Sequence, residues 1–259
     1  MSDVTFTGER LHADDALFGV DLAQHRAAYL FAIERAGQGR VLELGSGTGY
    51  GSAEIAQALG SLVALDRVAP LHASRRSGAR YVRADLNAVP FRAAAFDQIV
   101  SFQVIEHLED PSAYLGAIAR LLHPDGEALI TTPNLLTSLG VNPYHVHEYT
   151  GAELADTLRR YFRSVDVRGV GASEPVARYL AARRARITRI MKIDPLGLHK
   201  LLPRGLVDWL FGALAVVVRR GVQRDDALPE VTPRDFPIAE SGPAADDCVD
   251  LLAVCREPI

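Results

Sequence analysis

Three glycines, Gly45, Gly47 and Gly49, follow directly after the apolar run 41–44, which contains one acid, Glu43. Glycine adopts backbone conformations with positive φ and lets a ligand approach the main chain. The helix that we predict next, over 53–59, offers unpaired N–H groups and the positive end of its dipole. A strand, a glycine-rich turn and a helix in this order predict a cofactor-binding site.

The spacing of these glycines distinguishes two classes of cofactor. Dinucleotide sites use the pattern GxGxxG. A template that starts at Gly45 meets Tyr50 at its third glycine, and one that starts at Gly47 meets Ser52. A carboxylate at Glu43 would also repel the two phosphates of a dinucleotide. The pattern therefore favours a cationic cofactor over a dinucleotide.

With these residues the chain resembles the class I S-adenosylmethionine-dependent methyltransferases, whose first motif, E/DxGxGxG, is matched by Glu43 and the three glycines. In that family the acid lies near the positively charged methionine end of the cofactor. Asp66, at the end of the predicted strand 62–66, resembles the acid that binds both ribose hydroxyls, and its two oxygens suit a vicinal diol. Asp85 and Leu86 resemble the residues that contact adenine. The alternatives are that Asp66 caps the next helix and that Asp85 starts a turn.

Two later segments continue the order of motifs in that family. The predicted fourth strand, 96–102, is followed by the segment 103–108, at the strand end where open α/β sheets bind ligands. The run 121–134 resembles the family's helix, proline-glycine turn and fifth strand. The resemblance implies S-adenosylmethionine as the cofactor. The residues implied in binding it are Glu43, Gly45, Ser46, Gly47, Gly49, Asp66, Arg67, Asp85, Leu86, Gln103, Arg10 and His25.

Two histidines and an acid lie close together in the run 142–149, after the predicted fifth strand. Methyl transfer is an in-line displacement, so the site must align the acceptor with the methyl donor and exclude water. An alcohol is a poor nucleophile while it is protonated, and histidine titrates near the working pH. We expect His145 to act as the general base and Glu148 to orient it.

His107 is a further catalytic candidate, although it also fits a structural role, and its neighbour Glu106 also fits a first-turn helix acid. The run 142–149 also fits a loop that is merely fixed on the sheet. A divalent ion held by histidines and carboxylates is another reading, since it would lower the pKa of the acceptor hydroxyl. No compact ligand motif supports a metal ion, so the metal reading stays open as an alternative that we do not favour.

A closer resemblance is to bacterial methyltransferases that act on sugars and polysaccharides, of the methylmannose polysaccharide methyltransferase type. The segments that carry it are 7–10, 49–51, 102–108, 132–134, 142–145 and 250–252. It implies O-methylation of a saccharide hydroxyl in polysaccharide biosynthesis, with Glu9, Arg10 and His25 closing over the cofactor. One alternative is a methyltransferase of a small natural product, a quinone or a lipid precursor. Another is a cofactor-binding partner subunit without catalytic activity.

The elements that position these residues alternate between strand, turn and helix from 40 to 134, which indicates a parallel sheet with helices on both faces. We predict an α/β fold with a doubly wound, Rossmann-like, seven-stranded methyltransferase sheet, an N-terminal helical cover and a helical insertion before the last strand. The chain then forms a single methyltransferase domain over 1–259. Its parts are the cover (1–39), the core (40–171), the insertion (172–245) and the last strand (246–259).

Thr150, with Glu153 three residues later, predicts a capping box at the start of a helix over 150–162. Alternating residues predict a sixth strand over 165–170, and the last strand is predicted over 248–255. In the resembled fold this seventh strand lies antiparallel beside the sixth.

The gap between these two strands is far longer than a hairpin turn and indicates an insertion. It contains a basic helix around 175–192 and an apolar helix over 206–218. Two such helices at the carboxyl edge of a sheet serve either as a lid or as an interface in a homodimer, and periodicity does not choose between them. The arginines of the first helix favour a solvated face over a patch for an anionic substrate.

The composition narrows the classes of partner. The chain has 259 residues, a formal net charge of −4 and a pI of about 6.1, so we expect no nucleic-acid partner. The apolar stretch 206–218 is too short to span a bilayer, and the N-terminus lacks a secretory signal pattern. Cys248 and Cys255 would point to opposite faces of a strand, so a disulfide is not expected. A cytoplasmic protein that acts on a small molecule or a saccharide is predicted.

Overall fold

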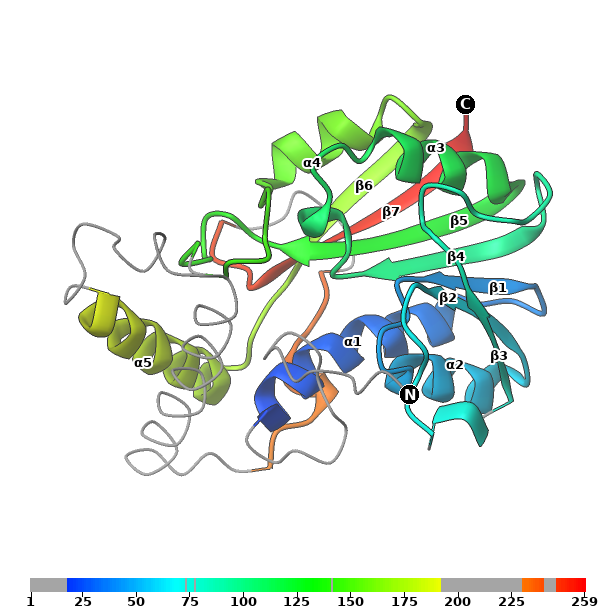
Figure 1. Cartoon of the computed structure of the whole chain (residues 1–259). Helices are drawn as coiled ribbons and strands as arrows, with labels where there is room; N and C mark the ends of the chain where they lie inside the picture. Colours follow the sequence, from blue (N-terminus) through cyan, green and yellow to red (C-terminus); the bar gives the residue numbers. More distant parts are fainter. Residues whose placement is uncertain (1–17, 73, 77, 141, 192–229, 240–245) are drawn as a thin grey trace.

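The computed structural model describes residues 18–72, 74–76, 78–140, 142–191, 230–239 and 246–259, and within these ranges the chain forms a seven-stranded sheet (Figure 1). The strand order is β3-β2-β1-β4-β5-β7-β6. The strands are β1 (Val41–Leu44), β2 (Leu62–Asp66), β3 (Ala79–Arg83), β4 (Phe96–Phe102), β5 (Leu122–Pro133), β6 (Phe162–Val170) and β7 (Asp250–Pro258). Neighbouring strands are parallel, except that β7 is antiparallel to both β5 and β6. The predicted doubly wound α/β fold is confirmed.

Helices cover both faces of the sheet, with α3 and α4 on one face and α1 and α2 on the other (Figure 1). The helices are α1 (Gly19–Arg35), α2 (Tyr50–Leu59), α3 (Ser112–Leu121), α4 (Gly151–Leu158) and α5 (Glu174–Met191), and short 3-10 turns are η2 (Ser74–Arg76), η3 (Ile105–His107) and η5 (Pro233–Asp235). Leu115 of α3 and Ile55 of α2 are fully buried in the separate apolar cores on the two faces. These cores hold the parallel strands so that the carboxyl ends of β1, β2, β4 and β5 meet along one edge, where ligands bind in such sheets.

The start of α4 is specified by local side chains. The Thr150 hydroxyl accepts a hydrogen bond from the backbone N–H of Glu153, whose carboxylate accepts one from the N–H of Thr150, so the predicted capping box is confirmed. The predicted end of this helix at residue 162 is wrong, because α4 ends at Leu158. Phe162 instead begins β6, where it is fully buried and pairs with Pro258. Pairing with a distant strand decides this boundary.

The proline-glycine turn predicted after α3 is part of β5 instead. Phe96 of β4 pairs with Leu122, and the next pair is Gln98 with Glu127, so the intervening residues of β5 form an irregularity in the register. The last strand, predicted over 248–255, is displaced toward the C-terminus and is β7. In both places the sheet takes in more of the chain than local propensity indicated.

The described part of the predicted insertion lies between β6 and β7 and contains α5, which agrees with the predicted basic helix. Arg183 of α5 donates a hydrogen bond to Asp21 of α1 at 2.9 Å, and both side chains are mostly buried. Near the other end of this segment, Ile238 bridges to Val170 at the end of β6. The predicted helix over 206–218 lies outside the described residues, so the choice between a lid and a dimer interface stays a prediction.

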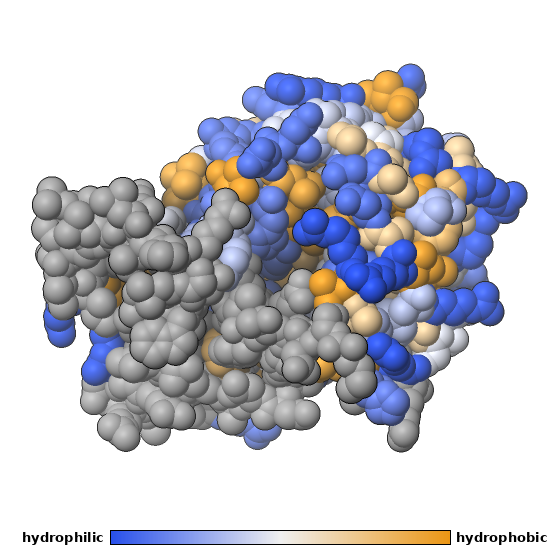
Figure 2. Space-filling model, viewed as in Figure 1, coloured by the Kyte–Doolittle hydropathy of each residue, from blue (hydrophilic) through white to orange (hydrophobic). Residues whose placement is uncertain are grey.

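Among the described residues, no helix is long and apolar enough to cross a membrane. Hydrophilic and hydrophobic residues are interspersed over the coloured part of the view in Figure 2. Cys248 and Cys255 are buried free thiols. Both belong to the core that includes α3 and α4, so the prediction that they point to opposite faces is wrong; Cys248 precedes β7 and does not follow its alternation.

Candidate active site

The glycine turn joins β1 to α2 and is held by the neighbouring strand. The backbone N–H groups of Gly45 and Ser46 both donate to the carbonyl of Leu65 on β2, at 2.8 and 3.2 Å. Gly45 has a φ of 83°, and a Cβ there would lie 2.3 Å from the Val104 side chain. Only glycine therefore fits at this position. The turn packs against the segment after β4, which links the two strand ends that the sequence predicted to form the site.

Gly47 shows that the turn has an open side. Its φ is 52°, and a Cβ at this position would meet no atom within 4 Å. Its backbone N–H donates to a carboxylate oxygen of Asp66 at 2.8 Å. The turn therefore presents bare main chain to open space, which fits the approach of a ligand.

Asp66, at the end of β2, faces this turn. Its second oxygen accepts from the backbone N–H of Val68 at 2.8 Å. A cavity of about 330 Å³ adjoins it; its lining includes Ser46, Asp66, Arg75 and Tyr81. Each carboxylate oxygen has two lone pairs, so both retain acceptor capacity for hydroxyls of a ligand. Arg67, the next residue, is exposed, and its carbonyl accepts from Arg83 at 2.9 Å.

Glu43 lies in β1 with its side chain buried from solvent. The Tyr29 hydroxyl donates to one of its oxygens at 2.7 Å, and the Ser52 hydroxyl donates to the other. Burial raises the pKa of Glu43, while the two hydrogen bonds oppose that rise. Sequence reasoning missed Tyr29 and Ser52 as partners. The residue in the sequence that could have indicated a close contact is Gly51, between the glycine turn and the predicted helix. A Cβ at Gly51 would lie 1.9 Å from the Tyr29 ring.

The other residues predicted to bind the cofactor are distributed around this edge. Asp85 is exposed in the loop after β3 and accepts from the backbone N–H of Asn87 at 2.8 Å, which is the turn geometry kept as an alternative. Leu86 packs partly against the core. His25 on α1 lies with Nδ1 3.1 Å from the Tyr50 hydroxyl, and burial lowers its pKa. Arg10 lies outside the described residues.

Gln103, the first residue after β4, has a backbone conformation that favours glycine. Its φ is 55°, and its N–H donates to the carbonyl of Thr131 on β5 at 3.1 Å. Non-glycine residues with positive φ are uncommon and concentrate at functional sites. The chain turns here so that η3, with Glu106 and His107, lies beside the loop after β5.

His145 and Glu148 are brought together as predicted. The Nδ1 atom of His145 lies 2.6 Å from a Glu148 oxygen, and the side-chain amide of Asn142 lies 2.8 Å from Nε2. Burial raises the pKa of Glu148, but the hydrogen bond from His145 and the other donors outweigh it, so the net pKa is below its ordinary value. Glu148 is therefore ionised at neutral pH and accepts from Nδ1–H. The amide nitrogen of Asn142 can only donate, so Nε2 of His145 is the acceptor in that contact and carries the lone pair.

His107 adjoins this pair from the other loop, and the two rings pack edge to face with centroids 5.1 Å apart. Its Nδ1 atom lies 2.9 Å from the carbonyl oxygen of Tyr144, which can only accept. The backbone N–H groups of Val146 and His147 donate to the carbonyl of Glu106, at 2.8 and 3.2 Å. These bonds tie the loop after β5 to η3.

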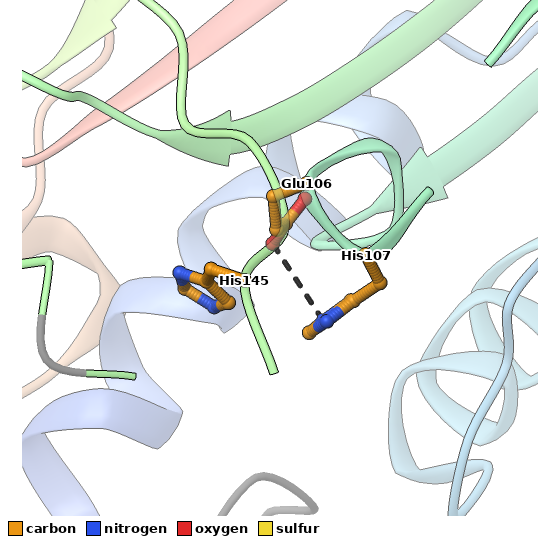
Figure 3. A group of neighbouring side chains, drawn as sticks. All are labelled: Glu106, His107 and His145. Atoms are coloured by element: carbon orange, nitrogen blue, oxygen red, sulfur yellow. Dashed lines mark ion pairs between the residues drawn. The ribbon is translucent and has the colours of Figure 1, made fainter. Parts of the chain in front are cut away.

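Glu106 lies beside His107 and His145, and the sequence analysis did not assign it to the site. Its side chain is fully buried and accepts from the Thr132 hydroxyl of β5 at 3.2 Å. Figure 3 shows Glu106 and His107 on the turn after β4 and His145 on the neighbouring loop. Within the described residues, these three side chains each place a ligand-type atom within 4.8 Å of the others. Because β4 and β5 are neighbours in the parallel sheet, the segments that follow them, 103–108 and 142–149, could have been expected to lie side by side.

Asp250 is a second residue that the sequence did not place at the site. It begins β7, it is buried, and it accepts from the side-chain amide of Gln24 on α1 at 2.7 Å. Burial raises its pKa to about 6. Because β7 runs antiparallel, its first residue lies at the edge where the parallel strands end, and Asp250 pairs there with Pro133 of β5.

Comparison with known proteins gives matches over much of the chain. A protein family described as "Methyltransferase domain" matches residues 20–170. A Mycolicibacterium smegmatis protein named as a probable S-adenosylmethionine-dependent methyltransferase is 34% identical over 167 residues, which cover 61% of this chain and 64% of that protein. A ubiquinone biosynthesis O-methyltransferase of Xanthomonas axonopodis is 34% identical over 119 residues, 42% of this chain and 49% of that protein. The matches thus span less than two thirds of each of these relatives.

Solved structures share the fold at lower identity. A protein from Thermotoga maritima described as a SAM-dependent methyltransferase, possible histamine N-methyltransferase, has a TM-score of 0.56 and 16% identity. The alignment covers 93% of this chain and 98% of that chain. At this identity the similarity establishes the architecture of the sheet and its helices, and not the acceptor.

Proposed function

This chain belongs to the methyltransferase-domain family, and from that premise we propose that it transfers a methyl group from S-adenosylmethionine to a hydroxyl of a saccharide or a sugar-containing metabolite. The sequence-based prediction of a class I methyltransferase agrees with the family. The single observation that carries the acceptor chemistry is the pairing of His145 with Glu148 beside His107, at the ends of β4 and β5. It places a proton acceptor at the edge of the sheet that carries the glycine turn.

The glycine turn and Asp66 are the residues that would hold the cofactor. Gly47 leaves open space beside bare main chain, and Asp66 retains acceptor capacity toward ribose hydroxyls. When bound, S-adenosylmethionine supplies a methyl group on a cationic sulfonium. Glu43 lies buried in the strand that leads into the turn, where its carboxyl group suits a cation better than a phosphate.

His145 is the residue that we assign as the general base. Its Nδ1–H is donated to ionised Glu148, which fixes the ring and its tautomer. The lone pair on Nε2 accepts from the Asn142 amide, so this position is already shaped for a hydrogen-bond donor. An acceptor hydroxyl that replaces the amide there would pass its proton to Nε2 as its oxygen takes the methyl group, while the electron pair of the broken carbon–sulfur bond stays on sulfur. A general base of this kind contributes roughly 10² to 10⁴ in rate.

The hydrogen-bonding side chains around His145 support a polyhydroxylated acceptor. Asn142, Gln103 and His107 lie on the two loops that converge at this point, and each offers donors or acceptors. Sugar hydroxyls need such partners, because an unpaired polar group in a site costs free energy. A phenolic or quinone precursor is the second candidate, since one relative is named a ubiquinone biosynthesis O-methyltransferase. A cofactor-binding subunit without turnover is the third.

The test is formation of S-adenosylhomocysteine with a panel of saccharides and a panel of phenolic quinone precursors. We expect turnover with a saccharide, and a drop of about 10² or more in kcat for His145→Ala. The exposed His147→Ala is the matched control, since its side chain lies in the same loop but outside the pair, and it should keep its activity. Turnover with phenols alone would reassign the acceptor, and cofactor binding without any turnover would favour the binding subunit.

Cofactor binding is tested separately by calorimetry. Asp66→Ala removes the carboxylate assigned to the ribose, and two lost hydrogen bonds to a charged group predict a loss in affinity of at least about 100-fold. Unchanged affinity for S-adenosylmethionine would refute the assignment of Asp66.

A further inference from the structure

Glu106, His107 and His145 form a cluster of metal-ligand side chains (Figure 3). One ligand-type atom from each lies within 4.8 Å of the others, and Glu106 Oε1 is 4.0 Å from His107 Nε2. Bonds of 2.0 to 2.2 Å to a tetrahedral ion bring ligand atoms to about 3.4 Å from one another. Rotations that move these atoms by about 1 Å therefore convert the cluster into a coordination site.

The surroundings of both imidazoles are an independent observation that points to a metal ion. Histidines that bind metals donate their other ring N–H to a carboxylate or a backbone carbonyl, which fixes the tautomer and raises the basicity of the ligand nitrogen. Here His145 donates from Nδ1 to Glu148, and His107 donates from Nδ1 to the carbonyl of Tyr144. In both rings Nδ1 is thus committed to an acceptor, and Nε2 is the nitrogen that can bind a metal ion.

The backbone that supports the cluster is already ordered by contacts between the two loops. Val146 and His147 donate to the Glu106 carbonyl, and the Glu106 side chain is fully buried against Thr132. Such contacts lower the cost of ordering the ligands when an ion binds. One hydrogen bond must be given up, because the Asn142 amide donates to His145 Nε2.

We propose that Glu106, His107 and His145 form a binding site for a divalent transition-metal ion of the Zn²⁺ class. Two imidazole nitrogens and one carboxylate oxygen suit Zn²⁺ or Co²⁺, whereas Mg²⁺ prefers oxygen ligands and retains its waters. Three protein ligands leave a fourth position open, as in zinc sites that bind a water or a substrate.

A consequence for activity rests on the proposed function. An ion on Nε2 of His145 takes the lone pair that the general base needs, so the bound ion and proton transfer to His145 exclude each other. Excess Zn²⁺ therefore inhibits the methyl transfer, and a chelator restores it.

Binding is measured by calorimetry of the whole chain, stripped with a chelator and titrated with Zn²⁺ and with Co²⁺. We expect one ion per chain, with affinity lowered at least about tenfold in His107→Ala and in His145→Ala. Glu148→Gln keeps the shape of the side chain but loses its charge, and a partner of a ligating histidine typically contributes 10-fold to 100-fold in affinity. His123→Ala is the control, because that histidine is half-exposed beside Asp125 and is not part of the cluster; this variant should bind the ion as wild type does.

The outcomes separate this site from the proposed function. No ion bound, or equal affinity in wild type, His107→Ala, His145→Ala and Glu148→Gln, would overturn the site, while turnover by the chelator-treated enzyme would leave the proposed function intact. Ion binding that depends on the cluster, in a protein that turns over no acceptor, would support the site and refute the function. Zn²⁺ that accelerates turnover would support the site and overturn the assignment of His145 as base. Thermal unfolding with and without Zn²⁺ shows that each variant is folded and reports the loss of stabilisation by the ion.

Discussion

We predict that the stability of Asp250→Asn, measured relative to wild type, is higher at neutral pH than at acid pH. Asp250 is 5% exposed, and its carboxylate accepts a hydrogen bond from the side-chain amide of Gln24 at 2.7 Å. Burial raises its pKa from 3.8 to about 6 and outweighs the lowering by its polar neighbours Gln24, Gln103 and His145. An ionised carboxylate is therefore held at a cost in the folded state at pH 7.

The sign follows from proton linkage. The folded protein binds a proton at Asp250 more tightly than the unfolded chain does, so the contribution of this group to stability is complete below pH 3.8 and is lost as the pH rises through 6. The difference between the two pKa values corresponds to about 3 kcal/mol. Integrated between about pH 5 and about pH 7.5, the loss amounts to roughly 1.4 kcal/mol of the free energy of unfolding.

Urea unfolding followed by circular dichroism, at these two pH values, measures the effect. Asparagine does not titrate, so the stability of Asp250→Asn relative to wild type should rise by roughly 1.4 kcal/mol from the lower to the higher pH. Any pH-independent cost of the substitution cancels in this difference. Asp246→Asn, at an exposed carboxylate a few residues earlier, is the control and should show no such change. A constant difference between wild type and Asp250→Asn at both pH values would refute a raised pKa caused by burial.

Two further predictions concern packing. Gly51→Ala should destabilise the fold by about 1 to 3 kcal/mol in thermal or urea unfolding, because its Cβ would lie 1.9 Å from the Tyr29 ring. Gly37→Ala is the control and should change stability little, because a Cβ there meets nothing within 4 Å. Equal stabilities for the two variants would contradict this contact. Cys248 and Cys255 should not react with a thiol reagent at about pH 8 until the protein unfolds. Both thiols are buried, and burial raises their pKa values to about 11 and about 12. Rapid labelling of either thiol in the folded protein would contradict this burial.

The local features of this protein were predictable from the sequence because they depend on neighbouring residues. The turn with Gly45, Gly47 and Gly49 follows from the need for positive φ between a buried strand and a helix. The capping box of Thr150 and Glu153 satisfies N–H groups of its own helix, three residues apart. The pair of His145 and Glu148, also three residues apart, meets within one loop as expected. Each needs only short-range geometry.

Strand ends required the tertiary structure. β6 begins at Phe162 and β7 extends to Pro258 because those two residues pair with each other across the sheet. A local pattern assigned the first to a helix and omitted the second. The irregularity of β5 likewise exists only because β4 lies beside it.

The composition of the site was also decided by tertiary contacts. Glu106 had the same sequence pattern as a solvated helix acid, yet the loop after β5 donates two N–H groups to its carbonyl and buries it beside His107. Gln24 meets Asp250 across 226 positions of the chain. Types and spacings of residues specify which turns and caps can form. The tertiary structure decides which carboxylates are buried and which histidines contact them, because those surfaces meet only when the strands pair in the sheet.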